Sequence, residues 1–518
     1  MLFDALARGA DLIPDSLWTV VYVLWIIAGT VFLLLRRRRS TTTLAWILAF
    51  WSLPLISGLG YFMFGPRRLD DQGGLRQRAR KAAADHIPPV SQDLQQAFVD
   101  KFDLAPLARV SQASDDPEPG PKQARAVQLF ADGDSAFPAI LRAIELAEET
   151  VHLEYYIWEP DVIGTRMRDA LTEKASQGVT VRIIVDAIGG KDCRGEFWQP
   201  IVDAGGEVRK FNPPHILKPQ PGKLNFRTHR KIVLIDGHIA FTGGINVSDS
   251  SRSIGSGEGE PAWRNTHLSI DGAPATGLQA IFLEDWLYSV PVDAVNRGER
   301  NALDLLPDSE TKPSIPDDIQ RWFPDRDAQS TIPATEDAPW VQIVDSGPDE
   351  KSEDIHLLFF TAITSAKRRL WITTPYFVPD PPIETALASA CARGVDVRII
   401  IPADSDSKLA NAAAQTYAAD ASDKGAKIWL FEPHMNHSKT MIVDDELSIV
   451  GTANMDNRSF RLNFELVAAI YDGNVTAQLA DMFERDQSNS RPYESGEVNA
   501  GLINRLVANT ARLLAPLL

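Results

Sequence analysis

Two patterns with the same residue types and the same spacing are the part of this chain best suited to catalysis. In each, a histidine is followed by lysine at +2, aspartate at +7, glycine at +14 and asparagine at +17. The two sets are His229, Lys231, Asp236, Gly243 and Asn246, and His437, Lys439, Asp444, Gly451 and Asn454. With a background of ~5% per residue type, four such matches after a given histidine arise by chance about once in 10⁵. The repetition therefore indicates an internal duplication, either of half a catalytic site or of a structural element without activity.

The segments that follow the two histidines have the alternation of β-strands. Residues two apart on a strand share a face, so each histidine and the lysine at +2 place a base beside a fixed cation. The short polar segments 236–238 and 444–446 predict hairpin turns, which would return each asparagine to the neighbourhood of its histidine. Each pattern therefore predicts one half of a phosphate-binding site.

A phosphodiester is the substrate that two such halves would fit. Two lysine ammonium groups and two asparagine amides can bind the non-bridging oxygens, most strongly as negative charge grows in the transition state. One histidine can attack phosphorus, while the other protonates the leaving oxygen and then deprotonates the acceptor hydroxyl. The predicted reaction passes through a phosphohistidine and needs neither metal nor cofactor. The residues alone leave open which histidine attacks.

Around the two patterns the chain repeats a larger unit. Residues 175–186 (ASQGVTVRIIVD) are echoed by residues 391–402 (CARGVDVRIIIP), and an aromatic, strand-like segment precedes each copy. A helix that leads through glycine into a continuous β-branched run is typical of a helix packed on a buried parallel strand. We therefore predict two α/β lobes related by a pseudo-twofold axis, with His229 and His437 meeting between them.

The remaining segments differ in composition. Residues 70–125 are polar and rich in proline, which predicts a linker. The first lobe is expected over residues 126–335 and the second over residues 336–518. The second lobe ends in a tail from Leu502 in which apolar residues and arginines have a helical period, as in an amphipathic helix.

The N-terminal segment, residues 1–69, has the pattern of a transmembrane helical hairpin. Two stretches without a charged residue predict spans of about 17–35 and 44–64, each near the ~20 apolar residues that cross a bilayer. Acidic residues precede the first stretch, where a signal peptide would have basic ones, so the pattern argues against a cleaved signal peptide. Seven basic residues flank the hairpin and four lie in its loop, which predicts cytoplasmic termini and lobes. A pair of buried helices in a soluble protein is the alternative.

Composition argues against several other classes of protein. The 518 residues include 52 Lys and Arg and 69 Asp and Glu, so the formal net charge is −17. This charge argues against a nucleic-acid-binding surface. The two cysteines, Cys193 and Cys391, are too few for a disulfide framework or a Cys-rich zinc site.

The doubled pattern resembles the H-x-K-x4-D signature of the phospholipase D superfamily. Within it the chain is similar to bacterial cardiolipin synthases, through the N-terminal spans and the segments WRNTH (263–267), TTPYFVPD (373–380) and GTANMDNRSFRLNFE (451–465). The resemblance implies phospholipase D-like lobes and phosphatidyl transfer between two phosphatidylglycerol molecules, which yields cardiolipin and glycerol. It also implies a multi-pass protein in the anionic lipid bilayer of the bacterial inner membrane, and it leaves a homo-oligomer open.

The same resemblance implies roles for individual residues. His229 is expected to be the nucleophile and His437 the general acid and base, with Lys231 and Lys439 beside them. The expected substrate contacts are Asn246, Asn454 and Glu465.

Four acidic or amide positions complete the expected site. Asp236 and Asp444 are counted with the catalytic motifs, although their place at a strand end suits a structural role. Glu465 matches the acidic residue that, in the family, orients the histidine of the second motif. Asn265 stands where relatives commonly have an acidic residue, and its amide is expected to support an imidazolium at His229 less well than a carboxylate would.

Other functions are compatible with parts of the pattern. A phospholipase D-type hydrolase, or a transferase that makes another phospholipid, would share every residue named above. A phosphodiesterase acting on nucleic acid would require a basic groove, which the net charge of −17 disfavours. An inactive membrane scaffold would lack motif residues, whereas both sets are complete. These residues do not reveal whether phosphatidylethanolamine can serve as a donor.

Overall fold

The structure is a computed structural model in which the chain forms two units. It describes residues 15–35, 40–53, 57–58, 60–61, 73–87, 92–102, 105–110, 120–214, 225–252, 263–292, 315–323, 337–349, 353–494 and 510–512. The smaller unit consists of Met1–Arg68 and Pro219–Leu224, and the larger consists of Leu69–Lys218 and Asn225–Leu518.

Two helices of the smaller unit, α2 (Asp15–Leu35) and α3 (Ser40–Ser52), pack against each other. The ring of Trp25 stacks on that of Phe50, with 6.2 Å between their centroids. Gly29 makes this packing close, because a Cβ at this position would lie 2.8 Å from a ring carbon of Phe50. The two apolar segments therefore form a helical pair.

The predicted membrane spans lie only partly within the described residues. Residues 54–56, 59 and 62–64 of the second span and the loop arginines 36–39 lie outside them. In the portions of the chain that the structure describes, no helix combines the length and the apolar character needed to cross a bilayer.

Among the described residues of the larger unit, 16 strands form one sheet, and its order is symmetric about the centre. The strands of the first half are β1 (Lys122–Phe130), β2 (Thr150–Tyr155), β3 (Thr180–Asp186), β4 (Glu207–Phe211), β5 (Lys231–Ile235), β6 (Ile239–Gly243), β7 (His267–Gly272) and β8 (Val290–Pro291). The strands of the second half are β9 (Trp340–Ser346), β10 (Arg369–Thr373), β12 (Asp396–Pro402), β13 (Lys427–Phe431), β14 (Thr440–Val443), β15 (Leu447–Gly451), β17 (Glu465–Tyr471) and β18 (Ser490–Pro492). The order is β18-β13-β12-β10-β14-β15-β17-β9-β1-β7-β6-β5-β2-β3-β4-β8. Read outward from the central β1–β9 pair, the two halves have the same succession of strands.

The predicted parallel strands and hairpins are confirmed. β2, β3 and β4 pair in parallel, and so do β10, β12 and β13. β5 and β6 form an antiparallel hairpin, and so do β14 and β15. The first residue of each turn, Asp236 (φ 49°) or Asp444 (φ 51°), has a left-handed backbone, which aspartate adopts more readily than most residues.

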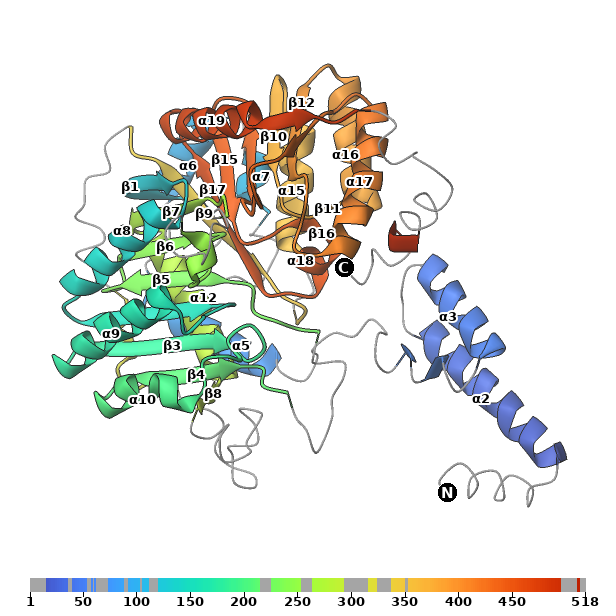
Figure 1. Cartoon of the computed structure of the whole chain (residues 1–518), viewed down its shortest axis with the longest axis horizontal. Coiled ribbons are helices and arrows are strands. Elements are labelled where there is room, and N and C mark those ends of the chain that lie inside the picture. The colour runs from blue at the N-terminus through green and yellow to red at the C-terminus, as the bar shows by residue number, and fades with distance from the viewer. Residues whose placement is uncertain are drawn as a thin grey trace. The chain divides into compact units, whose positions relative to one another are not determined.

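Helices cover both faces of the sheet (Figure 1). Those of the first half are α8 (Gly133–Leu146), α9 (Val162–Ser176), α10 (Gly195–Asp203) and α12 (Ala275–Tyr288). Those of the second half are α15 (Asp354–Ser365), α16 (Pro381–Ala392), α17 (Lys408–Asp423), α18 (Asn457–Arg461) and α19 (Gly473–Ser488). The remaining elements are the short helices η2 (Asp249–Ser251) and η4 (Ile319–Arg321), and β11 (Phe377–Val378), which pairs with β16 (Met455–Asp456). One hydrophobic core, which contains side chains of α12 and α19, is shared by both halves.

Residues 70–125, for which the sequence predicts a linker, contain three helices in their described parts. They are α5 (Gly73–Ala84), α6 (Gln92–Lys101) and α7 (Ala105–Ala108). α5 buries Ala79 and Ala83 in the shared core, and α6 buries Phe98 in the core of the second half. Alanines in an arginine-rich helix give little apolar periodicity, which explains why the composition resembles that of a linker. Of the predicted C-terminal tail, only residues 510–512 are described.

Candidate active site

The two histidines lie where each half of the sheet meets the other. His229 comes just before β5, and its backbone N–H donates to the carbonyl of Phe464, at 2.8 Å. His437 comes just before β14, and its N–H donates to the carbonyl of Arg264, at 2.7 Å. Since each histidine segment is bonded to the opposite half, the backbone itself brings the two motifs together. This convergence was predicted from the duplicated pattern.

Glu465, at the start of β17 in the second half, binds the histidine of the first half. A carboxylate oxygen lies 3.0 Å from His229 Nδ1. The carboxylate also accepts hydrogen bonds from Thr452 Oγ1 (2.5 Å), Ser459 Oγ (3.0 Å) and Asn463 Nδ2 (3.1 Å). Because Glu465 is fully buried and bonded on both oxygens, it is placed to orient the ring. The resemblance implies an orienting role for this residue, and the substrate contact also expected of it stays a prediction.

The protonation of this pair follows from its burial and its charges. Burial alone would raise the pKa of Glu465. The charges of His229 and Lys231 and the hydrogen bonds to the carboxylate have the opposite and larger effect, so the pKa of Glu465 lies below its ordinary value. Burial lowers the pKa of His229 to about 4, against the opposing effect of Glu465. At neutral pH the ring is therefore neutral, and an ionised Glu465 holds its proton on Nδ1. The Nε2 lone pair is then available to attack an electrophile.

The second histidine has an amide partner in place of a carboxylate. Asn265 Nδ2 lies 3.2 Å from His437 Nδ1, while Asn265 Oδ1 accepts from the backbone N–H of Thr266 at 2.9 Å. Burial, and then the charge of Lys439, hold the pKa of His437 well below its usual range. Since the partner of Nδ1 in the described residues is an amide and not a carboxylate, the imidazolium of His437 gives up its proton readily.

These two contacts correct the expected pairing of residues. The sequence interpretation assigns Glu465 to the histidine of its own motif and Asn265 to His229. In the structure Glu465 binds His229 and Asn265 binds His437. The physical reason is that the segments preceding β7 and β17 each bridge to the motif of the other half, at Arg264–Asn436 and Thr228–Phe464. No feature of a duplicated sequence distinguishes a partner in the same half from one in the opposite half.

The motif lysines form a buried pair of cations. Lys231 Nζ donates to the carbonyl of His229, and Lys439 Nζ to that of His437, each at 2.7 Å. Burial lowers the pKa of Lys231 to about 7. Burial, and then repulsion by Lys231, lower the pKa of Lys439 well below its usual value. An anion bound between the ammonium groups would relieve this repulsion, so the arrangement is suited to phosphate.

The motif asparagines are both buried. Asn246 Oδ1 accepts from the backbone N–H of Ile157 at 3.3 Å, which leaves its Nδ2 as the group that can donate to a ligand. Asn454 Oδ1 is buried, and it has no hydrogen-bond partner among the residues that the structure describes.

The motif aspartates lie away from the histidines, at the far ends of β5 and β14. Asp236 accepts from three successive backbone N–H groups, those of residues 148–150, at 2.8–3.0 Å. Asp444 accepts from those of residues 367–369 at 2.7–3.0 Å. About 17 Å of extended strand separates Asp236 from Lys231, at ~3.3 Å per residue. Both aspartates therefore brace strand ends, in line with the structural part of their expected role.

Two aromatic rings flank the histidines. The ring of Tyr156 packs edge-on against His229, with 5.1 Å between centroids, and that of Trp263 lies 5.3 Å from His437. The resemblance places Tyr156 at a strand end that faces the cleft, with a position in the core as the alternative, and gives Trp263 no role in the site. The sequence contains a sign of this position for Trp263, because that residue begins the WRNTH segment, which also contains Asn265.

Known proteins resemble this chain over nearly all of its length. A family model described as "Cardiolipin synthase, PLD-like domain" matches residues 140–256 and 359–487, one stretch in each half of the sheet. Cardiolipin synthase 1 of Bacillus anthracis is 35% identical over 513 residues, 97% of this chain and 95% of the relative. The major cardiolipin synthase ClsA of Bacillus subtilis (strain 168) is 31% identical over 98% of this chain and 100% of its own.

A solved structure has the same fold. The phosphatidylserine synthase of Haemophilus influenzae Rd KW20 matches 80% of this chain and 100% of its own, with a TM-score of 0.58 and 14% identity. At that identity the likeness establishes the phospholipase D-like α/β fold alone. Together with the near-full-length relatives, it means that the chain belongs to the bacterial cardiolipin synthases of the phospholipase D superfamily, a family of phosphatidyltransferases.

Proposed function

We propose that this chain transfers a phosphatidyl group from one phosphatidylglycerol to a second, forming cardiolipin and releasing glycerol. The observation that carries the proposal is the convergence of His229 and His437, each held at Nδ1 by a residue from the other half of the sheet. Such a site has a nucleophile and a proton donor of different character. A two-step displacement at one phosphorus requires that combination.

In the first step His229 Nε2 attacks phosphorus and the bond to the glycerol oxygen breaks. The imidazolium of His437 gives that oxygen its proton, so glycerol leaves as a neutral alcohol. In the second step neutral His437 takes the proton of the acceptor hydroxyl as its oxygen attacks the phosphohistidine. His229 then leaves, and His437 is protonated again for the next cycle.

The cations of the site stabilise both displacements. Lys231 and Lys439 bind the non-bridging oxygens, together with the side-chain amides of Asn246 and Asn454, as negative charge grows on them. The bound diester in turn raises the pKa of both lysines and of His437 relative to the empty site, because its negative charge favours their charged forms. Substrate therefore favours the protonation state that the first step needs.

The products of the reaction test this proposal. The enzyme is incubated with vesicles of phosphatidylglycerol, and the lipids and free glycerol are measured. Cardiolipin and glycerol in equal amounts are expected. Phosphatidic acid without cardiolipin would identify a hydrolase and overturn the proposal. A different phospholipid product from an added alcohol, at rates above that of cardiolipin, would identify another transferase.

The helical pair α2–α3 is the proposed anchor in the bacterial inner membrane, with the lobes in the cytoplasm. α2 has 21 residues, and none after Asp15 is charged. Apolar side chains of both helices are exposed, including Leu35, Leu44 and Trp51. An exposed apolar surface of this kind is stable when lipid covers it. The anchor would hold the site at a surface made of its substrates.

A further inference from the structure

Helix α5, which follows the N-terminal unit in sequence, delivers an arginine into the interior of the larger unit. Arg76 is only 3% exposed. Its guanidinium donates to both carboxylate oxygens of Asp349, at 3.1 and 3.2 Å, and to Asp285 on α12. The burial of Ala79 and Ala83 on the same helix fixes α5 against the shared core. Arg76 Nε also lies 3.5 Å from Glu284. Arg76 is thus held in place, with its charge matched by Glu284 and Asp285 on α12 and by Asp349, which follows β9.

The same guanidinium lies over the aromatic ring that precedes Glu465. Arg76 Cζ is 4.5 Å from the centroid of Phe464. The ring also faces Gly347, where a Cβ would lie 2.6 Å from Phe464 Cδ1. The carbonyl of Phe464 accepts from the N–H of His229 at 2.8 Å. Phe464 therefore connects the packing beneath the site to both members of the His229–Glu465 pair.

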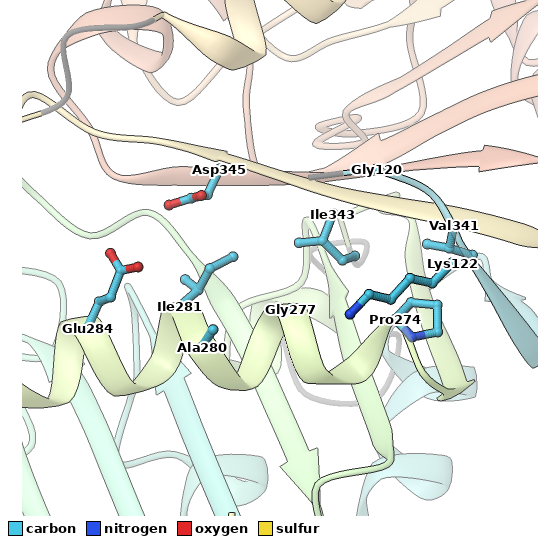
Figure 2. Close-up of a pocket in the computed structure, with 10 residues that line it drawn as sticks. All are labelled: Gly120, Lys122, Pro274, Gly277, Ala280, Ile281, Glu284, Val341, Ile343 and Asp345. Carbon is cyan, nitrogen blue, oxygen red and sulfur yellow. The ribbon is translucent and has the colours of Figure 1, made fainter. Parts of the chain in front are cut away.

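A second buried arginine, Arg230, contacts Asp285 as Arg76 does. Arg230, next to His229 in sequence, donates to Asp345 and to the Asp285 oxygen that Arg76 does not use. Arg230 Nε also donates to the backbone carbonyl of Glu465 at 3.3 Å. Figure 2 shows Asp345 on β9 and Glu284 on α12 at the same end of a pocket that runs along α12. Asp285 and Asp345 therefore connect α5, α12 and β9 to Arg230, the residue that follows His229.

We infer that Arg76 is a positioning residue for the His229–Glu465 pair, which makes α5 part of the catalytic centre. The inference rests on the proposed role of His229 as nucleophile. Without Arg76, Phe464 loses the group packed on its face, and Asp285 and Asp349 each lose a buried cationic partner. The peptide that presents Glu465 then shifts, and His229 Nε2 is no longer aimed at phosphorus. Misplacement of a reacting group by about 1 Å can cost ~100-fold in rate.

Arg80 provides a matched control on the same helix. It lies one turn after Arg76 and donates to Glu284 at 2.7 Å. Its replacement removes one arginine from α5, as replacement of Arg76 does, and breaks the ion pair with Glu284, which Arg76 also contacts at 3.5 Å. It leaves the face of Phe464 covered and the contacts of Arg76 with Asp285 and Asp349 in place. Comparison of the two variants separates a role in positioning from a general role in holding α5.

The experiment measures kcat, KM and the thermal unfolding transition of the full-length enzyme on phosphatidylglycerol vesicles, for Arg76→Ala, Arg76→Lys, Asp349→Asn and Arg80→Ala. The expected result for Arg76→Ala is a kcat lower by about 10- to 100-fold with KM within about twofold. Arg76→Lys, which keeps the charge but not the planar group, should recover part of the loss. Asp349→Asn should lower kcat less than Arg76→Ala, and Arg80→Ala should stay near the parent.

Equal kcat values for the Arg76 and Arg80 variants would overturn the inference, and so would a fall in kcat that only follows the folded fraction. If Arg76→Ala does not fold, Arg76→Lys and Asp349→Asn decide the question by the same criterion. Failure of the proposed function would give a different result from failure of the inference, because His229→Ala would then remain active. Failure of the inference alone leaves His229→Ala inactive and the Arg76 variants active.

Discussion

At the scale of single residues, the two halves of the site differ most at one pair of positions. In the strand registers His267 pairs with Gly243 and Val467 with Gly451, so Asn265 is the counterpart of Glu465. One histidine therefore has a carboxylate partner and the other an amide. A carboxylate stabilises an imidazolium and an amide does not, so this single difference gives the two rings unlike acidities.

Replacement of the amide tests this asymmetry. In Asn265→Asp, a carboxylate beside His437 should raise the pKa of its ring. Since the first step needs protonated His437, the alkaline limb of the profile of kcat/KM against pH should move to higher pH. The maximum rate should fall, because His437 becomes a weaker acid. The measurement is the pH profile of both enzymes, and a limb that stays in place or moves to lower pH would contradict the assignment of His437.

At the scale of elements, the strand–turn–strand units are what the sequence predicts best. Alternation identified the strands around each motif lysine, and the polar tripeptides identified their turns, because these signals are local. Helix α5 escaped prediction, since its buried face consists of alanines and one arginine. The sequence identifies Glu465 and Asn265 as partners of the histidines but pairs each with the wrong one, because long-range pairing between two equivalent halves leaves no local trace.

The motif aspartates make a prediction at this scale. Asp236→Ala or Asp444→Ala removes the acceptor of three backbone N–H groups, which should destabilise the fold by about 1–3 kcal/mol. The thermal transition should fall by several degrees. Enzyme that remains folded should still form the phosphohistidine, because neither carboxylate reaches the histidines. A folded Asp236→Ala enzyme that forms no adduct would show instead that the aspartate acts in the chemistry.

At the scale of the whole molecule, symmetry explains why the site needs both halves. The mirrored strand order places the β1–β9 pair at the centre. The residues just before β5 and β14 are joined to the opposite halves by the backbone bonds of His229 to Phe464 and of His437 to Arg264. Each half supplies one histidine, one lysine and the partner of the other half's histidine. Neither half alone contains an oriented histidine, so a single lobe should be inactive.

The N-terminal helices carry the prediction that concerns membrane attachment. If α2 and α3 are embedded in lipid, the enzyme should stay in the membrane fraction after an alkaline wash and enter solution only with detergent. The measurement is the distribution of the enzyme between pellet and supernatant, with a peripheral protein as control. Release by alkali alone would contradict the anchor.

The central claim is that His229 and His437 act on one phosphorus, the first as nucleophile and the second as acid and base. The most direct test is to trap phosphohistidine from labelled phosphatidylglycerol in the parent enzyme, in His229→Ala and in His437→Ala. The adduct should be absent from His229→Ala. In His437→Ala it should form slowly and then persist, because the second step lacks its base. An adduct that is lost only in His437→Ala would reverse the two roles, and an adduct present in both variants would contradict the shared site.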